Sequence, residues 1–493
     1  MKIFIITFLI IPLFASLSSF IIKNKRFAEY ISLLSSSLCL LGAFIILYFS
    51  ISLKTISIFN SAIVIDKFSA YIILLVSIVY FLSSMYSISY MRLAMEGEQL
   101  TGEEFNRYYL FLNLFALTML MAPMINNMAI YLIDIELTTI ASAFLVIAEV
   151  TEKSIEAAWK YILIVSAGIS LALLGTILFY LSGNIPGSAN TISSLDWTTL
   201  RLNAVYLNKD IIRFAFVLIV IGLGTKVGLA PMHTWLPDAH SEAPSPISSM
   251  LSASLLNTAM YGIMRYFSIT GKGIGFNYPQ TIMVIIGIFT IFTGVMGIIN
   301  QKSTKRLFAY SSIEHMGIIS LGFGLGGAFG TFGALLQMLG HSLAKPVMFF
   351  GSGNLLHKYK TKDIKKIKGV FYVMPKTAFL FSIGVLALIG SPPSVTFISE
   401  FLIILQSLKN GYYAVAIVLV SLLIAAFVSL LSKVGSIVFG KDDNSLNIQK
   451  GDFGLASVLP MALPLAALII LGFYIPGNLY RLLMGITHII IIK

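Results

Sequence analysis

Five ionisable side chains lie inside long apolar stretches of the sequence, where charge is otherwise rare. They are Glu136, Lys226, His341, Lys345 and Glu400. A charged Lys or Asp at the centre of a bilayer costs about 2.5–3.5 kcal/mol on insertion scales, so residues of this kind mark functional sites by default. Carboxyl, amine and imidazole groups bind and release protons, so these residues predict proton transfer within a membrane.

Small polar side chains accompany Glu136. Thr138, Thr139 and Ser142 follow it closely, and residues of this size are typical of contacts between membrane helices. Asp134 precedes Glu136 by two positions, or about 200° around a helix, so the two cannot share one face. We therefore expect Glu136 to face a neighbouring helix and Asp134 to lie nearer the lipid headgroups.

His341 and Lys345 are four positions apart, which places them on one face of a helix. A single buried histidine is more often a packing residue, and packing is the alternative for His341. A histidine and a lysine on the same face of an apolar span favour a path for protons.

Proline residues predict that two of the apolar helices are interrupted. Pro231 has no N–H group and its ring clashes with the carbonyl of residue 227, so a helix should break just after Lys226. The pair Pro392–Pro393 should cause a second break, before Glu400. Two interrupted helices with an ionisable residue beside each break, about 170 positions apart, are typical of transporters built from two repeats.

Further ionisable residues are candidates for a gate or for water access. They are His233, Asp238, His240, Lys305, Glu314 and His315. The first three also have the residue types of a metal site. Because they fall around Pro237 at a helix end, we expect them to hold that loop or to control the access of water.

The composition places all these residues in a membrane protein. Of 493 residues, 57% are hydrophobic and only 11% are charged, and no soluble fold has an interior large enough for that much apolar side chain. About fourteen apolar runs have the length of a membrane-spanning helix. They lie near residues 3–21, 28–50, 68–91, 107–125, 128–149, 158–181, 211–231, 245–269, 280–300, 304–323, 329–355, 374–405, 412–440 and 455–475. We expect an all-α polytopic membrane protein without a soluble domain.

Most of the positive charge lies in the loops between these runs. The net charge is +12, and the odd-numbered loops carry roughly nineteen Lys or Arg residues against about eight in the even-numbered ones. By the positive-inside rule the odd loops face the cytoplasm and both termini lie outside. The richest cluster, residues 357–369, is either a topology anchor at anionic headgroups of the lipid bilayer or a docking site for a cytoplasmic partner. Because the charge has this membrane explanation, no nucleic acid is expected as a partner.

The first apolar run, residues 3–21, imitates a secretory signal, but the further runs that follow it favour an uncleaved first helix. Cys39 is the only cysteine, which excludes disulfide frameworks and Cys-ligated clusters within this chain. Redox cofactors are therefore expected only in partner subunits. The loops also contain no nucleotide-binding motif or nucleophile constellation that would indicate a free-standing enzyme.

Residues 226–266, KVGLAPMHTWLPDAHSEAPSPISSMLSASLLNTAMYGIMRY, resemble the signature of the antiporter-like membrane subunits of respiratory complex I. That family includes subunits of multisubunit sodium/proton antiporters and of membrane-bound energy-converting hydrogenases. The similarity continues through STKRLFAYSSIEHMG at 303–317, HSLAKPVMFFGSGNLL at 341–356 and GSPPSVTFISEF at 390–401. Together these segments cover roughly residues 105–410.

The resemblance implies fourteen helices and a proton path along the membrane midplane. Spans four to eight and nine to thirteen would form two inverted five-helix repeats that contain the broken helices. The chain would then divide into peripheral helices (residues 1–105), a first repeat (106–270), a second repeat (271–440) and a last helix with a C-terminal tail (441–493).

Position by position, Glu136 matches the family's glutamate of span five and Lys226 its lysine of the broken span seven. His341 matches the histidine of span eleven, and Glu400 the terminal acidic residue of the broken span twelve. One position departs from the pattern: Asn257 stands where the complex I subunit-4 type has a lysine. This puts the usual relay from lysine to lysine in doubt, although asparagine can hydrogen-bond water.

The complex I subunit-5 type has a lysine in place of Glu400 and a long C-terminal lateral helix, whereas this chain ends at Lys493. The segments LLN, SSIEHMG and SPP…FISEF instead resemble most the component F type of hydrogenase-4 and its archaeal membrane-bound relatives.

The expected function is that of a proton or sodium/proton translocating subunit in a redox-driven complex. Movement of Glu136 toward Lys226 would hold the proton of the lysine, because opposite charges about 4 Å apart are worth on the order of 4 kcal/mol at an effective dielectric constant of about 20. Movement away would release the proton through His341 and Lys345 to Glu400.

The resemblance also implies partners in the plasma membrane of a prokaryote. These are other antiporter-like and small membrane subunits, and cytoplasmic redox-arm subunits that carry iron–sulfur clusters, with or without nickel–iron. The chain would belong to an oxidoreductase complex of the NADH or ferredoxin:quinone type or of the hydrogenase type. The alternatives are a subunit of a sodium/proton antiporter without redox partners and a mainly structural scaffold subunit.

Overall fold

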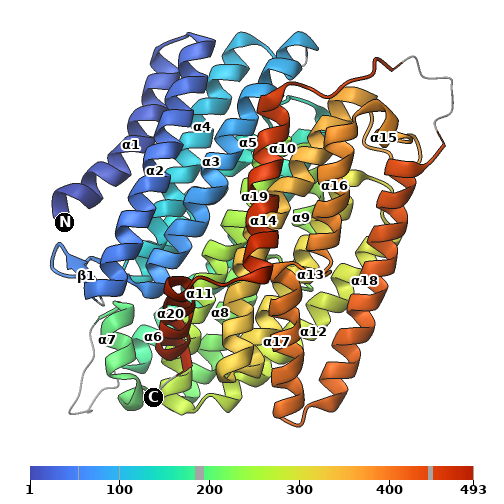
Figure 1. Cartoon of the computed structure of the whole chain (residues 1–493). Coiled ribbons are helices and arrows are strands. Elements are labelled where there is room, and N and C mark those ends of the chain that lie inside the picture. The colour runs from blue at the N-terminus through green and yellow to red at the C-terminus, as the bar shows by residue number, and fades with distance from the viewer. Residues whose placement is uncertain (54, 99, 184–193, 442–447, 492–493) are drawn as a thin grey trace.

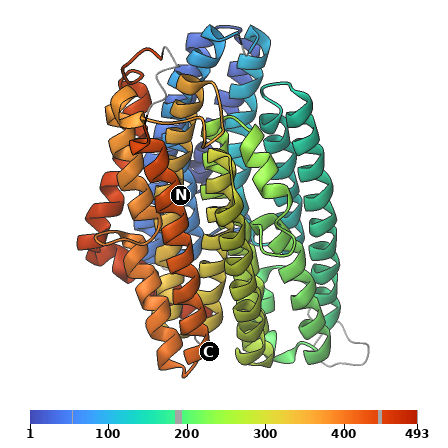
Figure 2. The same cartoon turned by 90° about the vertical axis from the view of Figure 1, so that its right-hand side faces the viewer.

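The computed structural model describes the chain except for residues 54, 99, 184–193, 442–447 and 492–493. The described residues form long helices that run side by side along one direction, as Figure 1 and Figure 2 show. Eight helices of this described part are long and apolar enough to cross a membrane by length and composition. They are α1 (Lys2–Ile21), α2 (Lys25–Leu53), α3 (Lys67–Glu96), α5 (Met128–Val146), α6 (Glu152–Ser182), α12 (Asn277–Asn300), α18 (Tyr413–Phe439) and α19 (Leu455–Phe473). The predicted fold class, a helical membrane protein, is therefore confirmed.

The other predicted spans also coincide with helices, but these are interrupted or carry more polar side chains. They are α4 (Gly102–Met121), α8 (Lys209–Val227), α11 (Leu256–Ile274), α13 (Thr304–Leu325), α14 (Gly327–Tyr359), α16 (Pro375–Leu388) and α17 (Val395–Lys409). Shorter helical segments are α7 (Trp197–Leu202), α9 (Trp235–Glu242), α10 (Ser245–Met250), α15 (Val370–Val373), the 3₁₀ turns η1 (Ala122–Met124) and η2 (Ala204–Tyr206), and the π turn η3 (Leu251–Leu255).

Both predicted interruptions are present. Helix α8 ends at Val227 and α9 begins only at Trp235. Gly228 caps α8 with a φ of 80°, a left-handed conformation that glycine adopts without a steric cost. Helix α16 likewise ends before, and α17 begins after, the pair Pro392–Pro393. The proline positions therefore predicted the breaks correctly, because a helix cannot continue through them.

Several elements have no counterpart in the sequence predictions, among them a β-hairpin and a helix near the C-terminus. Strands β1 (Thr55–Ile58) and β2 (Ile63–Asp66) form an antiparallel hairpin before α3. The expected C-terminal tail contains a further helix, α20 (Gly477–Ile491), which packs against α11 and α14. In Figure 1 the hairpin and the C-terminus lie toward the lower end of the bundle, and α15 lies at its upper end.

The helices group around the two interruptions. Helix α6 packs along α8 and also contacts α5 and α9, so these helices surround the first break. Helix α14 packs against α13, α16 and α17, which surround the second break. Helix α11 packs against α8, and the π turn η3 that precedes it contacts α14. This segment therefore joins the two groups.

Candidate functional site

The first interruption leaves its backbone groups bonded to protein. The indole Nε1 of Trp235 donates to the carbonyl oxygen of Thr225 at 2.8 Å. The backbone N–H of Ala230 donates to Oγ1 of Thr290, on α12, at 3.0 Å. Irregular backbone at membrane depth is stable only where protein or water satisfies it, and here α9 and α12 do so.

Lys226 lies fully buried in the last turn of α8. Its Nζ donates to Oγ1 of Thr139 on α5 at 2.7 Å and to the hydroxyl of Tyr161 on α6 at 2.8 Å. The hydroxyls of Tyr161 and Ser142 are 2.7 Å apart, which extends the contact along α5. The ammonium group thus has neutral oxygen partners from two neighbouring helices, a setting that holds a proton without fixing it in an ion pair.

Glu136 lies one turn before Thr139 on α5 and is half-buried. Its Oε1 accepts a hydrogen bond from the Ser166 hydroxyl of α6, and its Oε2 has no partner among the described residues. No ion pair within 4 Å joins Glu136 to Lys226 in the part of the chain that the structure describes. The acid therefore faces the α5–α6 contact, where it is hydrogen-bonded to Ser166 and not to the lysine.

Asp134 lies on the buried face of α5. Its side chain is only 1% exposed, and neither carboxyl oxygen has a hydrogen-bond partner among the described residues. Tyr131 and Thr138 lie on the same buried face, and the position of Asp134 nearer the headgroups stays a prediction. Glu136, which is more exposed than Asp134, lies at the edge of that face.

The second group of charged residues is arranged along one face of α14. Gln337, His341 and Lys345 follow one another at intervals of four residues and are all fully buried. Nζ of Lys345 donates to the carbonyl oxygen of Phe308 at 3.1 Å and to the hydroxyl of Ser311, both on α13. Like Lys226, this lysine is held by neutral oxygen atoms of a neighbouring helix.

A continuous row of polar side chains leads from His341 to the second interruption. The rings of His341 and His315 are 5.3 Å apart, and Nδ1 of His315 lies 3.2 Å from Nε2 of Gln337. The Ser399 hydroxyl donates to Oε1 of Gln337, and Ser399 is the neighbour of Glu400 on α17. His315, which the sequence suggested only as a gate candidate, therefore lies within the row.

Glu400 is buried against the second break. A Cβ atom added to Gly390 would lie 2.2 Å from Oε2 of Glu400, so only glycine leaves room for the carboxyl group there. Gly390 also has a positive φ of 68°. Glu314, on α13, is buried as well, at 4% exposure. Lys226 thus lies beside the irregular backbone of the first break, and Glu400 lies beside that of the second.

Asn257 joins the two groups structurally. Its Nδ2 donates to the carbonyl oxygen of Ala253 at 2.9 Å and to the Ser342 hydroxyl of α14 at 2.9 Å, whereas its Oδ1 has no partner among the described residues. The π turn before it brings the Ser252 carbonyl oxygen within 3.2 Å of Nε2 of His341. Such widened turns are frequent at functional sites of helices. Asn257 therefore ties α11 to α14 instead of supplying a charge.

His240 lies between the two groups and is also fully buried. Its ring stacks on Phe349 with centroids 5.3 Å apart, and neither ring nitrogen has a partner in the described structure. Three hydroxyls of the following segment are buried without a protein partner as well: those of Ser245, Ser249 and Ser254. An unsatisfied buried polar group costs about 1–3 kcal/mol, and ordered water usually satisfies such groups. The region of His240, Ser245, Ser249 and Ser254, called the junction below, is therefore chemically suited to hold water.

The remaining gate candidates have different surroundings. Asp238 is partly exposed and pairs with Arg306 at 2.8 Å and with Lys160 at 3.5 Å. Nζ of Lys305 is buried and donates to the carbonyl oxygen of Ala243 at 2.7 Å. His233 is half-buried beside the ring of Tyr310. The histidines at 233 and 240 therefore do not converge with Asp238 on one point, as a metal site would require.

A charged hollow of about 500 Å³ lies over this segment. Its lining includes Lys153, Glu156, Lys160, Asp238, Glu242 and Arg306. Because Asp238 and Glu242 belong to the same short helix, α9, as His240, the hollow adjoins the junction.

Comparison with known proteins agrees with this arrangement. Residues 125–426 match the family described as "NADH:quinone oxidoreductase/Mrp antiporter, TM". The "Hydrogenase-4 component F homolog" of Methylacidiphilum infernorum (isolate V4) is 34% identical over 420 residues, which cover 85% of this chain and 87% of that protein. Both findings confirm the resemblance that the sequence motifs indicated.

Two solved structures have the same fold. A chain of the membrane-bound sulfane sulfur reductase, an archaeal respiratory membrane complex, superposes with a TM-score of 0.86 at 23% identity, covering 98% of this chain and 97% of that one. A chain of the Mrp complex from Dietzia sp. DQ12-45-1b superposes with a TM-score of 0.85 at 17% identity, covering 98% of this chain and 96% of that one. This chain is therefore an antiporter-like membrane subunit and belongs to the NADH:quinone oxidoreductase/Mrp antiporter transmembrane family.

Proposed function

We propose that this chain moves protons across the membrane as one subunit of a redox-driven complex of the hydrogenase or complex I type. The observation that carries the proposal is a pair of clusters of buried polar side chains, one around Lys226 beside the first break and one from His341 through Gln337 to Ser399 beside the second break. Buried ionisable groups are expensive in a membrane and persist where they serve transport. The family membership and the relative of the hydrogenase-4 component F type support the same function.

In this proposal Lys226 is the first proton store, and Glu136 controls it. In the structure Nζ of Lys226 donates hydrogen bonds to the hydroxyls of Thr139 and Tyr161, and Glu136 accepts a hydrogen bond from the Ser166 hydroxyl. A small shift of α5 against α6 would exchange these partners and bring the acid closer to the lysine. A redox reaction in a partner subunit supplies the energy for that shift.

The proton then crosses the junction by way of water around His240 instead of a lysine at position 257. The unpartnered nitrogens of His240 and the unpartnered oxygen of Asn257 would hydrogen-bond that water. From there it reaches His341 and Lys345, and His315 and Gln337 pass it to Glu400. The charged hollow around Asp238 would let protons enter from the cytoplasm, and Lys305 and His233 would lie beside this entrance. Glu314 would lie farther along the path, beside Lys345.

The proposal includes a topology of fourteen spans with two inverted repeats, residues 106–270 and residues 271–440. Peripheral helices in residues 1–105 precede the repeats, and a last segment, residues 441–493, follows them. The matching order of an interrupted helix in each half supports this division. Both termini would lie outside the plasma membrane of a prokaryote, and the Lys-rich segment 357–369 would face the cytoplasm.

The proposed partners are other antiporter-like and small membrane subunits, together with a cytoplasmic redox arm. Iron–sulfur clusters, with or without nickel–iron, would be held by that arm, since this chain has a single cysteine. A sodium/proton antiporter without redox subunits is the second candidate, which the similarity in fold to the Mrp complex favours. Co-purification decides between them: redox subunits support the first candidate, and small membrane subunits alone support the second.

The function is tested by Lys226→Ala in the intact complex, reconstituted into proteoliposomes. We expect redox turnover to continue while proton uptake falls, because the first proton store is lost. Lys209→Ala is the matched control, since Lys209 lies exposed at the other end of the same helix. Proton uptake that is equal in both variants and the native complex would refute the proposal.

A further inference from the structure

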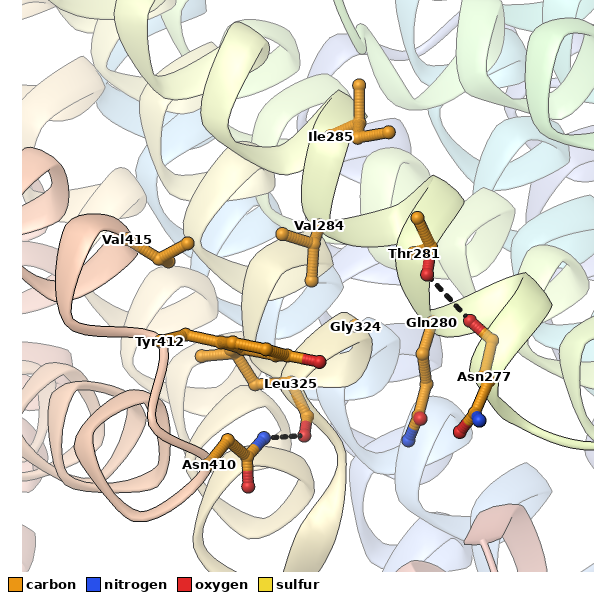
Figure 3. Close-up of a pocket in the computed structure, with 10 residues that line it drawn as sticks. All are labelled: Asn277, Gln280, Thr281, Val284, Ile285, Gly324, Leu325, Asn410, Tyr412 and Val415. Atoms are coloured by element: carbon orange, nitrogen blue, oxygen red, sulfur yellow. Dashed lines mark hydrogen bonds between the residues drawn. The ribbon is translucent and has the colours of Figure 1, made fainter.

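A cavity of about 310 Å³ lies where the start of α12, the end of α13 and the α17–α18 connection meet. Figure 3 shows the side chains around it, among them Asn277, Gln280, Thr281, Asn410 and Tyr412. The lining residues include amides and hydroxyls but no charged side chain. In Figure 1 the α17–α18 connection lies at the end of the bundle opposite α15. The cavity therefore lies away from the Lys-rich segment, and its uncharged wall combines amide and hydroxyl groups, to which water can hydrogen-bond, with the apolar side chains of Val284, Ile285, Leu325 and Val415.

Two amide side chains lead inward from this cavity. Nδ2 of Asn410 donates to the carbonyl oxygen of Leu325 at 2.8 Å, a contact visible in Figure 3. Nε2 of Gln406 donates to Oδ1 of Asn410 at 2.7 Å, and the backbone N–H of Phe329 donates to Oε1 of Gln406 at 3.2 Å. Gln406 is 5% exposed, so the polar chain continues from the cavity into the buried part of α17.

A buried apolar side chain lies between this polar chain and Glu400 along α17. Ile403 lies on α17 between Glu400 and Gln406, three positions from each, and is fully buried. A Cβ atom added to Gly322 of α13 would lie 3.0 Å from Cδ1 of Ile403, and one added to Gly333 of α14 would lie 3.0 Å from its Cγ1. The isoleucine thus fills a slot between two glycine positions on neighbouring helices.

The spacing explains why one residue is enough to close the route. With a rise of about 1.5 Å per residue, Glu400 and Gln406 are about 9 Å apart along the helix axis, with Ile403 halfway between them. A proton needs an unbroken chain of hydrogen-bonding groups, and the isoleucine side chain provides none. Apolar constrictions of this kind close a pore by excluding water.

We propose that Ile403 is the outer gate of the proton path. It keeps Glu400 dry while the cavity lined by Asn277, Gln280 and Asn410 forms a water-filled vestibule on the opposite side of the membrane from the Lys-rich segment. When α17 shifts or the isoleucine changes rotamer, water from the vestibule reaches Glu400 and takes its proton. The gate rests on the proposed function, because it matters only if Glu400 carries protons.

A gate at this position has a clear purpose in a coupled pump. If Glu400 were always in contact with water on one side and with the polar row on the other, protons would flow back down their gradient. A closed isoleucine slot prevents this leak between turnovers. The glycines at 322 and 333 let the branched side chain of Ile403 pack closely against α13 and α14.

Thiol accessibility tests the gate without relying on pumping. The chain has one cysteine, Cys39, so variants with a single cysteine in this subunit can be made in a Cys39→Ser background of the intact complex in proteoliposomes. The label is then measured on this subunit after the subunits are separated. The probe is a membrane-impermeant cationic methanethiosulfonate reagent. We expect Asn410→Cys to react from the side opposite the Lys-rich segment and Ser399→Cys to remain unreactive. Adding Ile403→Ser should make Ser399→Cys react at least about tenfold faster.

Equal reaction rates of Ser399→Cys with and without the added Ile403→Ser substitution would overturn the gate, as would an unreactive Asn410→Cys. If Ile403→Ser prevents assembly, the contrast between Asn410→Cys and Ser399→Cys in the native background still decides whether the vestibule is wet and the acid dry. Ile403→Val is the conservative control and should leave Ser399→Cys protected.

A leak measurement links the gate to Glu400. With the redox partner idle, Ile403→Asn should raise passive proton entry into proteoliposomes by about tenfold or more, and Glu400→Gln in addition should return it to the native level. A leak that persists after Glu400→Gln contradicts a gate on this path. Failure of the proposed function looks different: Lys226→Ala would then leave pumping intact whatever the labelling pattern is.

Discussion

The ion pair between Asp66 and Arg265 predicts a large loss of stability when its acid is neutralised. The two side chains are 7% and 6% exposed, and two hydrogen bonds of 2.7 and 2.8 Å join the guanidinium to the carboxylate. Asp66→Asn removes the negative charge but keeps an oxygen that caps α3, where Asp66 accepts from the backbone N–H of Ser69. The substitution therefore isolates the cost of a buried, unpaired arginine.

That cost should be about 3–5 kcal/mol, the range measured when one partner of a buried pair is removed. The remaining neighbours of Arg265 include the hydroxyl of Ser69 and the rings of Trp197, Tyr261 and Phe68, none of which carries a compensating charge. The double variant Asp66→Asn/Arg265→Met should recover most of the loss, because no charge is then left buried. Asp210→Asn is the control, since its pair with Arg213 is exposed and should contribute nothing measurable.

The assay is thermal unfolding of the purified complex, followed through the reaction of the buried Cys39 with a thiol dye and measured on this subunit after the subunits are separated. A melting temperature of Asp66→Asn equal to that of the native protein would refute the reasoning, and so would a double variant less stable than the single one.

The same pair sets a pH dependence. Burial alone would raise the pKa of Asp66, but the charge of Arg265 and the hydrogen bonds from Arg265 and Ser69 outweigh it and hold the pKa below its ordinary value. Because the folded-state pKa is the lower one, the stabilisation is fully present above about pH 4 and is lost as the pH falls below that value. Asp66→Asn should show no such loss in the acid range.

Two further predictions concern the interruption at α8 and the polar row. Gly228→Ala should destabilise the protein by at least about 1–2 kcal/mol, because the position has a φ of 80° and an added Cβ would lie 2.5 Å from Cδ1 of Leu236; Gly435→Ala, with nothing within 4 Å, should leave the melting temperature unchanged or raise it. Gln337→Leu should lower proton uptake about tenfold at unchanged redox turnover, since it breaks the link between His315 and Ser399. Its control is Ser352→Ala on the same helix, because the Ser352 hydroxyl donates to the carbonyl oxygen of Met348 one turn earlier in that helix. Proton uptake of Gln337→Leu at the native rate would exclude that residue from the path.

The sequence predicted the parts of the fold that depend on local chemistry. Apolar runs of spanning length require helices in a membrane, and a proline such as Pro231, with glycines beside it, favours a break because it removes a helix hydrogen bond. Proline alone does not decide this, since α14 continues through Pro346. The family followed from motifs with specific residues at specific spacings. The helix α20 and the hairpin before α3 were not predicted, because short or weakly apolar elements of this kind are fixed by their packing against α11 and α14 or by strand pairing.

The candidate site was only partly predictable for a similar reason. Apart from Asn257, the candidate residues were chosen from the sequence by their charge. Neutral side chains of the site, such as those of Gln337 and Tyr161, were therefore not among them. The interval of four between Gln337, His341 and Lys345 is a signal that would have revealed Gln337. No local pattern distinguishes Asp134 from Glu136, because which face of α5 turns inward is decided by α4, α6 and α11 and not by α5 itself.

The central claim is that one path joins the two interrupted helices, and its most direct test is the number of protons taken up per electron pair. Lys226→Ala and Glu400→Gln should each lower this number by the same amount, and the double variant should lower it no further, because both residues lie on one path. If the two losses add in the double variant, or if either variant keeps the native number, the account of a single path through this chain is contradicted.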